Sequence, residues 1–495
     1  MKKDKFIELI VIIAVTIILC SNFLQMHFSS DTYILCDIGY FEYPVKYFLP
    51  DGRLISALVC YIAGIFNLPI PVYIIGMDFI GMILLSLAIY IMSKVLRKII
   101  KPKDKFTEIL LIIASNILIL NQYALEYLLF PESAVMCLGV LFLVIAIKVL
   151  VESPKHKYLK IFICLLVTGL SYQAELNIFP VLAIMIYIVK QIKEKKKITI
   201  FLKEFIIEML KLSLIIMAVL AITLGIIYLT KSVLNNNTEK IISLTSYRAF
   251  IRRGRIVSKY MDELWNNCMH MLPKHTFTAT IVLTIILLVL TKAKKQTIIY
   301  YILLMMVILL VCTAPLFVFD TGIHGRVSVP LAMVMGISCI ILIANVQEIQ
   351  TKWIKNVAVV FTIFLFVVNA IFILQNIAEH IAANRVDEDN GKTIKYLIEK
   401  YEEENNIKVT KFSYTYDIIP QQFAVGIKPM QSMTERKFAW PWCVLYAMDY
   451  YCERNFELVD GNPFVFDSKN KYVNYDQFVD EQIIFEYDTV YMIIY

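Results

Sequence analysis

The stretch FIELIVIIAVTIILCSNFLQMHFSSDTYILCDIGY, residues 6–40, joins a long apolar run to two acids, Asp31 and Asp37. The run from residue 6 to residue 24 is long enough to cross a bilayer as a helix. No small-residue cleavage pattern follows it, so we expect the run to remain as a membrane helix rather than to be removed as a signal peptide. The two acids then lie just beyond the end of a membrane span.

The composition of the whole chain agrees with this reading. Of its 495 residues 59% are hydrophobic and only 18% are charged, which is too apolar for a soluble globular protein of this size. The sequence therefore predicts a polytopic membrane protein. The net charge of +7 comes largely from lysines in short runs between apolar segments. The positive-inside rule already explains such runs, so we expect no nucleic-acid partner.

Apolar stretches of about 17 to 25 residues predict about eleven transmembrane helices. They cover residues 6–24, 70–92, 106–122, 133–151, 159–173, 178–190, 205–229, 275–290, 297–317, 327–346 and 357–375. If the lysine-rich connectors all lie in the cytoplasm, an odd number of spans places the N-terminus inside and the C-terminus outside. We therefore expect an all-α membrane domain over residues 1–375.

Two outer loops of this topology are long. The first covers residues 25–69, and its apolar segment 54–68 would put the next basic loop on the wrong side if it crossed the membrane. We expect this segment to be a juxtamembrane helix. The second loop, residues 231–274, carries the basic cluster YRAFIRRGRIVSKY around Arg252. Such a cluster either binds lipid headgroups or contributes to a substrate site.

Other outer turns carry acids, amides and an arginine. FPES contains Glu132, SYQAELN contains Gln173 and Glu175, and FDTGIHGRVSVP contains Asp320 and Arg326. The spans beside Gln173 have about 15 residues and reach roughly 22 Å of a roughly 30 Å hydrocarbon core, so their polar tip should be recessed. An unpaired acid at such a depth costs about 2.5–3.5 kcal/mol, and Glu175 should therefore face a cavity or a partner.

The sequence becomes more polar after residue 375. DEDNGKTIKYLIEKYEEENN has the pattern of an amphipathic helix, and IKVTKFSYTY and DTVYMIIY have the pattern of strands. We expect a small extracytoplasmic α/β domain over residues 376–495. Cys443 and Cys452 in this domain could form a disulfide, or they could be two separate thiols.

These polar residues would gather at the outer membrane face. Arginine binds phosphate through a forked and permanently charged group, so Arg326 and members of the basic cluster such as Arg252 could hold the phosphate of a lipid substrate. Arg53 is a further candidate for substrate binding. A carboxylate beside them could deprotonate an acceptor hydroxyl as it attacks the anomeric carbon of a sugar. Glu132, Gln173 and Glu175 would then position the sugar or lie close to a metal ion.

The pattern resembles the GT-C superfamily of integral-membrane glycosyltransferases. SSDTYILCDIGY with DGRLI, the FPES turn, the SYQAELN hairpin tip and HGRVSVP are similar to the type II Gtr glucosyltransferases of bacterial surface polysaccharide. The resemblance covers most of residues 1–375. It implies a protein of the bacterial cytoplasmic membrane that moves a hexose, with glucose as the expected sugar, from a polyprenyl-phosphate donor to a cell-surface glycan or lipid-linked acceptor.

The same resemblance implies inversion at the anomeric carbon and a base in the first outer loop. That base is Asp31 by position, with Asp37 as the second choice. No organic cofactor is expected, and a divalent metal stays open. A polysaccharide polymerase or ligase, a lipid-linked sugar flippase or transporter, and a non-catalytic membrane scaffold are the alternatives. Each of these residues could instead have a purely structural role: helix capping for Asp31, headgroup anchoring for Arg53 and Arg326, and interhelical hydrogen bonding for Glu132 and Glu175.

Overall fold

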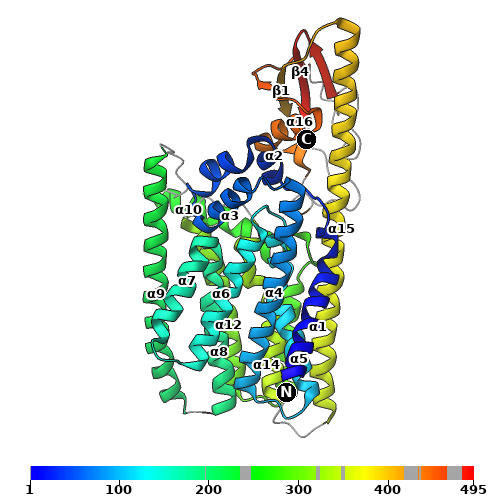
Figure 1. The fold of residues 1–495 in the computed structure, drawn as a ribbon. Helices are drawn as coiled ribbons and strands as arrows, with labels where there is room; N and C mark the ends of the chain where they lie inside the picture. The colour runs from blue at the N-terminus through cyan, green and yellow to red at the C-terminus, as the bar shows by residue number, and fades with distance from the viewer. Residues whose placement is uncertain are drawn as a thin grey trace.

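The fold is a bundle of long helices with a small domain at one end (Figure 1). The computed structural model describes residues 2–195, 197–234, 247–318, 324–346, 352–416, 433, 436–464 and 482–494. The N-terminus lies at the end of the bundle opposite the small domain (Figure 1). The predicted helical membrane protein with a small C-terminal sheet region is therefore confirmed.

The bundle helices coincide with the predicted apolar runs. Each of the eleven runs overlaps one of the helices α1 (Lys2–Cys20), α4 (Ile70–Ile100), α5 (Lys105–Ile119), α6 (Ser133–Glu152), α7 (Lys157–Ser171), α8 (Ile178–Glu194), α9 (Ile198–Val233), α11 (Thr276–Leu290), α12 (Lys295–Val318), α14 (Val334–Val346) and α15 (Lys352–Asn405). The remaining helices are α2 (Ser30–Tyr43), α3 (Leu54–Ile65), α10 (Tyr247–Met261), α13 (Val329–Ala332) and α16 (Pro441–Cys452). Short helical turns include η3 (Ala124–Leu128), η4 (Gln173–Asn177) and η7 (Gly325–Val327).

Seven helices of the described chain are long and apolar enough to cross a membrane. They belong to α1, α4, α6, α8, α9, α12 and α15, whereas α11 and α14 are apolar but shorter. The count of eleven spans stays a prediction. In α9 only 17% of the most apolar window is buried inside the protein, so most of this helix presents apolar side chains to its surroundings. A lipid environment would cover such a surface.

The ends of the bundle differ in charge. The connectors that hold Lys101, Lys103 and Lys105 and the lysines after α8 lie at the end that carries the N-terminus, since consecutive helices alternate in direction (Figure 1). There Arg97 of α4 binds Glu8 of α1, with its Nη1 at 3.0 Å from Oε2. The positive-inside rule keeps this end as the predicted cytoplasmic one.

The first loop forms two helices, α2 and α3, between the bundle and the small domain (Figure 1). Ser29 caps α2 because its Oγ accepts the Thr32 amide at 3.2 Å, while Thr32 Oγ1 accepts the Ser29 amide at 3.1 Å. The Pro-Asp-Gly turn before α3 needs Gly52 at a φ of 70°. The predicted juxtamembrane helix 54–68 is present as α3, from Leu54 to Ile65.

The long helix α15 connects the bundle to the small domain without a break (Figure 1). The predicted boundary between residues 375 and 376 falls inside it, and the predicted amphipathic helix is its last part. The sheet has the strand order β2-β1-β4-β3. Its strands are β1 (Lys411–Tyr416), β2 (Glu457–Leu458), β3 (Ile483–Glu486) and β4 (Thr489–Ile494), and only the β3–β4 pair is antiparallel.

Helix α16 closes the small domain over α2. Tyr33 of α2 is fully buried in the apolar core of the small domain, and its hydroxyl lies 2.6 Å from that of Tyr451 on α16. Cys443 and Cys452 both lie on α16, nine positions and about 13 Å apart along the helix axis. A disulfide needs Cα atoms within about 7 Å, so these two cysteines cannot pair with each other.

Candidate functional site

Arg53 and Glu132 form an ion pair at the end of the bundle beneath α2. Arg53 directly precedes α3, and Glu132 directly precedes α6, so each side chain starts from a helix N-terminus. Arg53 Nη1 donates to Glu132 Oε1 at 2.8 Å, and its Nη2 lies 3.7 Å from Asp51 Oδ2. The Arg53 side chain is 20% exposed, whereas that of Glu132 is 1% exposed. Arg53 is therefore the partly exposed member of the pair, and the Glu132 side chain is enclosed.

The electrostatics of Glu132 follow from this burial. Burial raises the pKa of Glu132 to about 7, although Arg53 opposes the rise, and Asp31 adds to it. For Arg53, burial disfavours the charged form, but the neighbouring acids, led by Glu132, outweigh it and raise the pKa of the guanidinium. Arg53 is therefore a permanent cation beside a carboxyl that titrates near neutral pH.

A second arginine is held by a second buried acid. Glu126 in η3 accepts the backbone amides of Gly325 at 3.3 Å and Arg326 at 3.1 Å. Arg326 Nη1 lies 3.4 Å from Glu126 Oε2, and its guanidinium carbon lies 4.2 Å from the centre of the Phe130 ring. The Tyr127 hydroxyl donates to the Arg326 carbonyl at 3.2 Å. These contacts fix the η7 turn and leave the Arg326 side chain 16% exposed.

The predicted hairpin tip between α7 and α8 lies against both arginine turns. Gln173 Nε2 donates to the Asp51 carbonyl at 2.7 Å, and Asn177 Nδ2 donates to the Val327 carbonyl at 2.6 Å. The ring of Tyr172 lies 4.9 Å from the Arg53 guanidinium carbon, and Tyr172 also raises the pKa of Arg326. One hairpin tip therefore connects the loop before α3 to the turn before α13.

Asp31 belongs to the same cluster. It is half-buried in the first turn of α2, and the Ser30 hydroxyl donates to its Oδ1 at 3.3 Å. Its charge acts on Glu132, Arg53 and Arg326. We call Asp31, Arg53, Glu132, Arg326 and Gln173 the outer cluster. The structure thus brings five of the residues singled out in the sequence into one region.

Glu175 lies behind the outer cluster, in η4. Its side chain is completely buried, and neither carboxylate oxygen has a hydrogen-bond partner in the part of the chain that the structure describes. A Cβ atom added to Gly139 of α6 would lie 1.9 Å from Glu175 Oε2, so the carboxyl occupies the space that this glycine leaves. The carboxyl of Glu175 is therefore enclosed by protein and does not reach the outer cluster's surface.

Two of the predicted site residues lie elsewhere. Asp37 is exposed on α2, where the nearest charges that act on it are Lys46 and Glu42, and its own charge acts on Asp449 of the small domain. Arg252 is exposed on α10. Its neighbour Arg253 is buried instead, with Nε donating to the Leu316 carbonyl at 2.8 Å. Asp320 lies outside the described residues.

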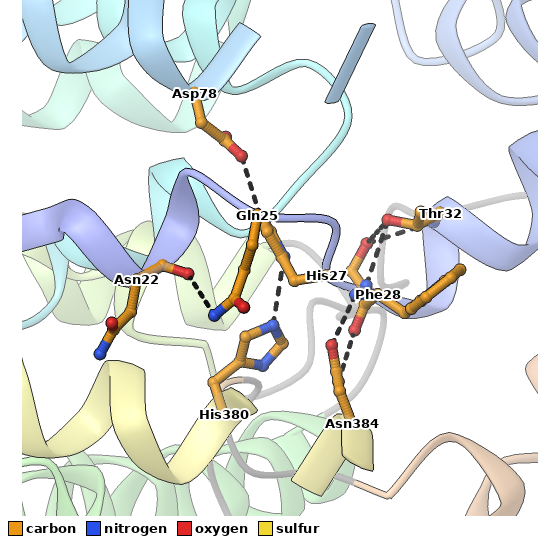
Figure 2. A network of polar contacts seen from close by, with 9 residues as sticks. Asn22, Gln25, His27, Phe28, Thr32, Asp78, His380 and Asn384 are labelled. Atoms are coloured by element: carbon orange, nitrogen blue, oxygen red, sulfur yellow. Dashed lines mark hydrogen bonds and ion pairs between the residues drawn. The ribbon is translucent and has the colours of Figure 1, made fainter. Parts of the chain in front are cut away.

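The structure also reveals a buried polar chain that the sequence reasoning missed (Figure 2). His27 Nε2 lies 2.9 Å from Asp78 Oδ2 of α4, and His27 Nδ1 lies 3.2 Å from His380 Nε2 of α15. His380 Nδ1 lies 2.6 Å from the Met433 carbonyl. A carbonyl only accepts, so His380 donates to it and takes a hydrogen bond from His27. Asp78 and His27 therefore share one proton, as an ion pair or as two neutral groups.

The same region ties the first loop to α15. Asn384 Oδ1 accepts the Phe28 amide at 2.6 Å, and Asn384 Nδ2 donates to the Phe28 carbonyl at 3.0 Å (Figure 2). These contacts anchor the backbone just before Asp31. One feature of the sequence could have indicated the buried polar chain. Asp78 is an acid within an apolar run, and such acids face protein and not lipid.

The outer cluster combines two cations, a half-buried acid and a carboxyl of near-neutral pKa. Such a set can bind a phosphate and accept a proton from a hydroxyl. Among the described residues no group of three or more His, Cys, Asp or Glu side chains is arranged to hold a metal ion. No protein-family model matches the sequence, and no match is found among curated proteins.

Proposed function

We propose that this protein is a membrane glycosyltransferase that moves a hexose from a polyprenyl-phosphate donor to a glycan or lipid-linked acceptor at the end of the bundle beneath the small domain. The observation that carries the proposal is the placement of Asp31 within electrostatic reach of both Arg53 and Arg326. An acid and two phosphate-binding cations are what this transfer requires.

Arg53 and Arg326 would bind the phosphate of the donor. Each is held in place by a buried glutamate, so little side-chain freedom remains to be lost on binding. The Arg53 side chain is partly exposed, and the Tyr172 ring lies 4.9 Å from its guanidinium carbon, which further limits its orientation. Helix α9 lies beside the cluster, since its Ile227 packs next to Gly52, and its exposed apolar side chains supply a surface on which a polyprenyl tail can lie.

Asp31 would act as the general base. Its carboxylate takes the proton of an acceptor hydroxyl, whose oxygen attacks the anomeric carbon of the sugar. The bond between that carbon and the donor phosphate oxygen breaks, and its electron pair leaves with the phosphate. Two guanidinium groups stabilise the negative charge that develops there. Attack from the face opposite the leaving group inverts the anomeric carbon.

The remaining members of the outer cluster would position these groups. Gln173 holds the Asp51 carbonyl next to Arg53, and Glu132 orients the Arg53 guanidinium. Glu175 would act through the hairpin tip rather than touch the substrate, since its carboxyl is enclosed. The lysine-rich connectors at the opposite end support the proposed orientation, with the N-terminus in the cytoplasm. The bacterial cytoplasmic membrane is proposed from the resemblance to the type II Gtr glucosyltransferases.

The proposal is tested with the purified full-length protein, a panel of radiolabelled polyprenyl-phosphate hexoses and a crude lipid-linked glycan acceptor. We expect transfer of one sugar per acceptor from one donor of the panel. Arg53→Gln and Arg326→Gln should each raise the donor KM at least tenfold. Addition of many sugars in one product would favour a polymerase or ligase. If no donor is consumed while labelled lipid-linked sugar crosses vesicles that contain the protein, the chain is a transporter and the proposal is wrong.

A further inference from the structure

A second polar cavity lies at the opposite end of the bundle from the outer cluster. It has a volume of about 190 Å³ and lies between the end of α8, the turn from α11 to α12 and the end of α14. These elements reach the end of the bundle that carries the N-terminus (Figure 1). We call it the basic cavity.

Three lysines line the basic cavity, and no acidic residue does so among those described. Lys195 follows α8 and Lys292 follows α11, and both have left-handed backbone angles with a φ of 52°. Lys294 directly precedes α12. All three side chains are exposed, so their ammonium groups can turn toward the mouth of the cavity. The N-terminus of α12 adds its own positive end to the same place.

The inner wall of the basic cavity carries hydroxyl and amide groups. Asn345 Nδ2 donates to Thr291 Oγ1 at 3.0 Å, which joins the end of α14 to the turn after α11. Tyr300 is only 7% exposed, and its hydroxyl has no hydrogen-bond partner among the described residues. A buried hydroxyl without a partner is costly, unless a ligand in the cavity supplies one.

We propose that the basic cavity binds a phosphate group, namely the phosphodiester of an anionic membrane phospholipid. The lysines supply the positive charge, and the Tyr300 hydroxyl donates a hydrogen bond to a phosphate oxygen. The position favours a lipid, because the cavity lies where apolar helices end in lysine-rich connectors. Basic pockets between membrane helices are suited to such headgroups. This site is independent of the proposed transfer reaction.

The test is native mass spectrometry of the full-length protein in detergent with phosphatidylglycerol, phosphatidylcholine or inorganic phosphate. Lys292→Gln with Lys294→Gln removes two charges from the cavity, and Tyr300→Phe removes only the hydroxyl. The matched control is Lys155→Gln with Lys160→Gln, which removes two charges from exposed lysines just before α7 and in its first turn.

We expect phosphatidylglycerol to bind the wild type and the control equally and to bind at least tenfold better than phosphatidylcholine. The Lys292/Lys294 variant should lose at least tenfold in affinity, and Tyr300→Phe should lose several-fold. Inorganic phosphate could instead bind with the same dependence on these variants, while phosphatidylglycerol has no advantage over phosphatidylcholine. The cavity would then bind a soluble phosphate compound, and the assignment to a phospholipid would be wrong. Equal binding of phosphatidylglycerol by the Lys292/Lys294 variant and the control would overturn the proposal.

Discussion

Replacement of Arg53 by methionine should destabilise the protein in a pH-dependent way, because it leaves Glu132 buried without its cation. In the wild type the pKa of Glu132 is about 7, above the 4.5 of an exposed glutamate. A raised pKa in the folded state means that the unfolding free energy falls as the pH rises from 4.5 to 7. Without Arg53 the pKa should rise further, so the fall continues beyond pH 7.

The size of the effect can be worked from these values. At pH 6 the carboxyl is mainly protonated in both proteins, so Glu132 contributes about equally to their stabilities. From pH 6 to pH 8 both proteins lose stability, but a variant whose Glu132 stays protonated at pH 8 loses about 1.4 kcal/mol more than the wild type, because the titration of Glu132 in the wild type is nearly complete by pH 8. Loss of the ion pair itself adds a destabilisation that does not depend on pH. Removal of one partner of a fully buried pair costs about 3–5 kcal/mol, and the 20% exposure of Arg53 should keep the loss below this range.

The assay is reversible unfolding in mixed detergent micelles, followed by tryptophan fluorescence at pH 6 and pH 8. The control is the Arg53→Met, Glu132→Gln double variant, which has no carboxyl at this position and should show no extra loss at pH 8. Equal destabilisation of the single variant at both pH values would refute the reasoning. So would a double variant that retains the extra loss at pH 8.

Three further substitutions test the packing around the site, each by the same unfolding measurement. Gly139→Ala should displace Glu175 and destabilise the protein by about 1–3 kcal/mol, and an unchanged stability would contradict the enclosed position of the carboxyl. Asp78→Ala should lower the free energy of unfolding by about 3–5 kcal/mol. Asp78→Asn can still donate a hydrogen bond to His27, so it should lower the free energy of unfolding by less than half as much. Equal losses of stability in the two variants would rule out the shared proton. Gly336→Ala places a Cβ atom 2.6 Å from the backbone of α5 and should cost at least about 1 kcal/mol, and an unchanged stability would contradict the close contact between α14 and α5.

The sequence predicted the helices well because each membrane helix requires a long apolar run, which is visible in the sequence. The run 54–68 contains a helix, as expected. Its hydropathy would also fit a membrane span, so its predicted place along the surface depended on the lysines that follow it. The end of the last span was harder to predict. Helix α15 continues past residue 375 because a helix needs no change of backbone when its surroundings change from apolar to polar.

The outer cluster was predictable because polar side chains at the ends of neighbouring helices meet at one end of a bundle. Their pairing was not, since Arg53 and Glu132 are far apart in the sequence and nothing local selects one acid over another. Asp37 illustrates the limit. It is only six positions after Asp31 on α2, yet the helix directs it toward the charges of Lys46 and the small domain.

Asp78 in its apolar run indicated a buried polar contact, but its pairing with His27 and His380 could not be predicted, for the same reason. Each residue comes from a different element, and His380 lies in a polar part of α15 where a histidine carries no signal. Only the tertiary packing that places the segment before α2 against α4 and α15 brings the three side chains together (Figure 2). Long-range polar contacts of this kind depend on tertiary structure, which apolar periodicity does not encode.

The most direct test of the central proposal is the initial rate of hexose transfer by Asp31→Asn and Asp37→Asn, measured beside the wild type on the donor that the panel selects. The substitution at Asp31 keeps the size of the side chain and removes its basicity, so we predict a loss of at least about a hundredfold in kcat. Asp37→Asn should stay within a few-fold of the wild type. Full activity of a folded Asp31→Asn protein would contradict the assignment of the base.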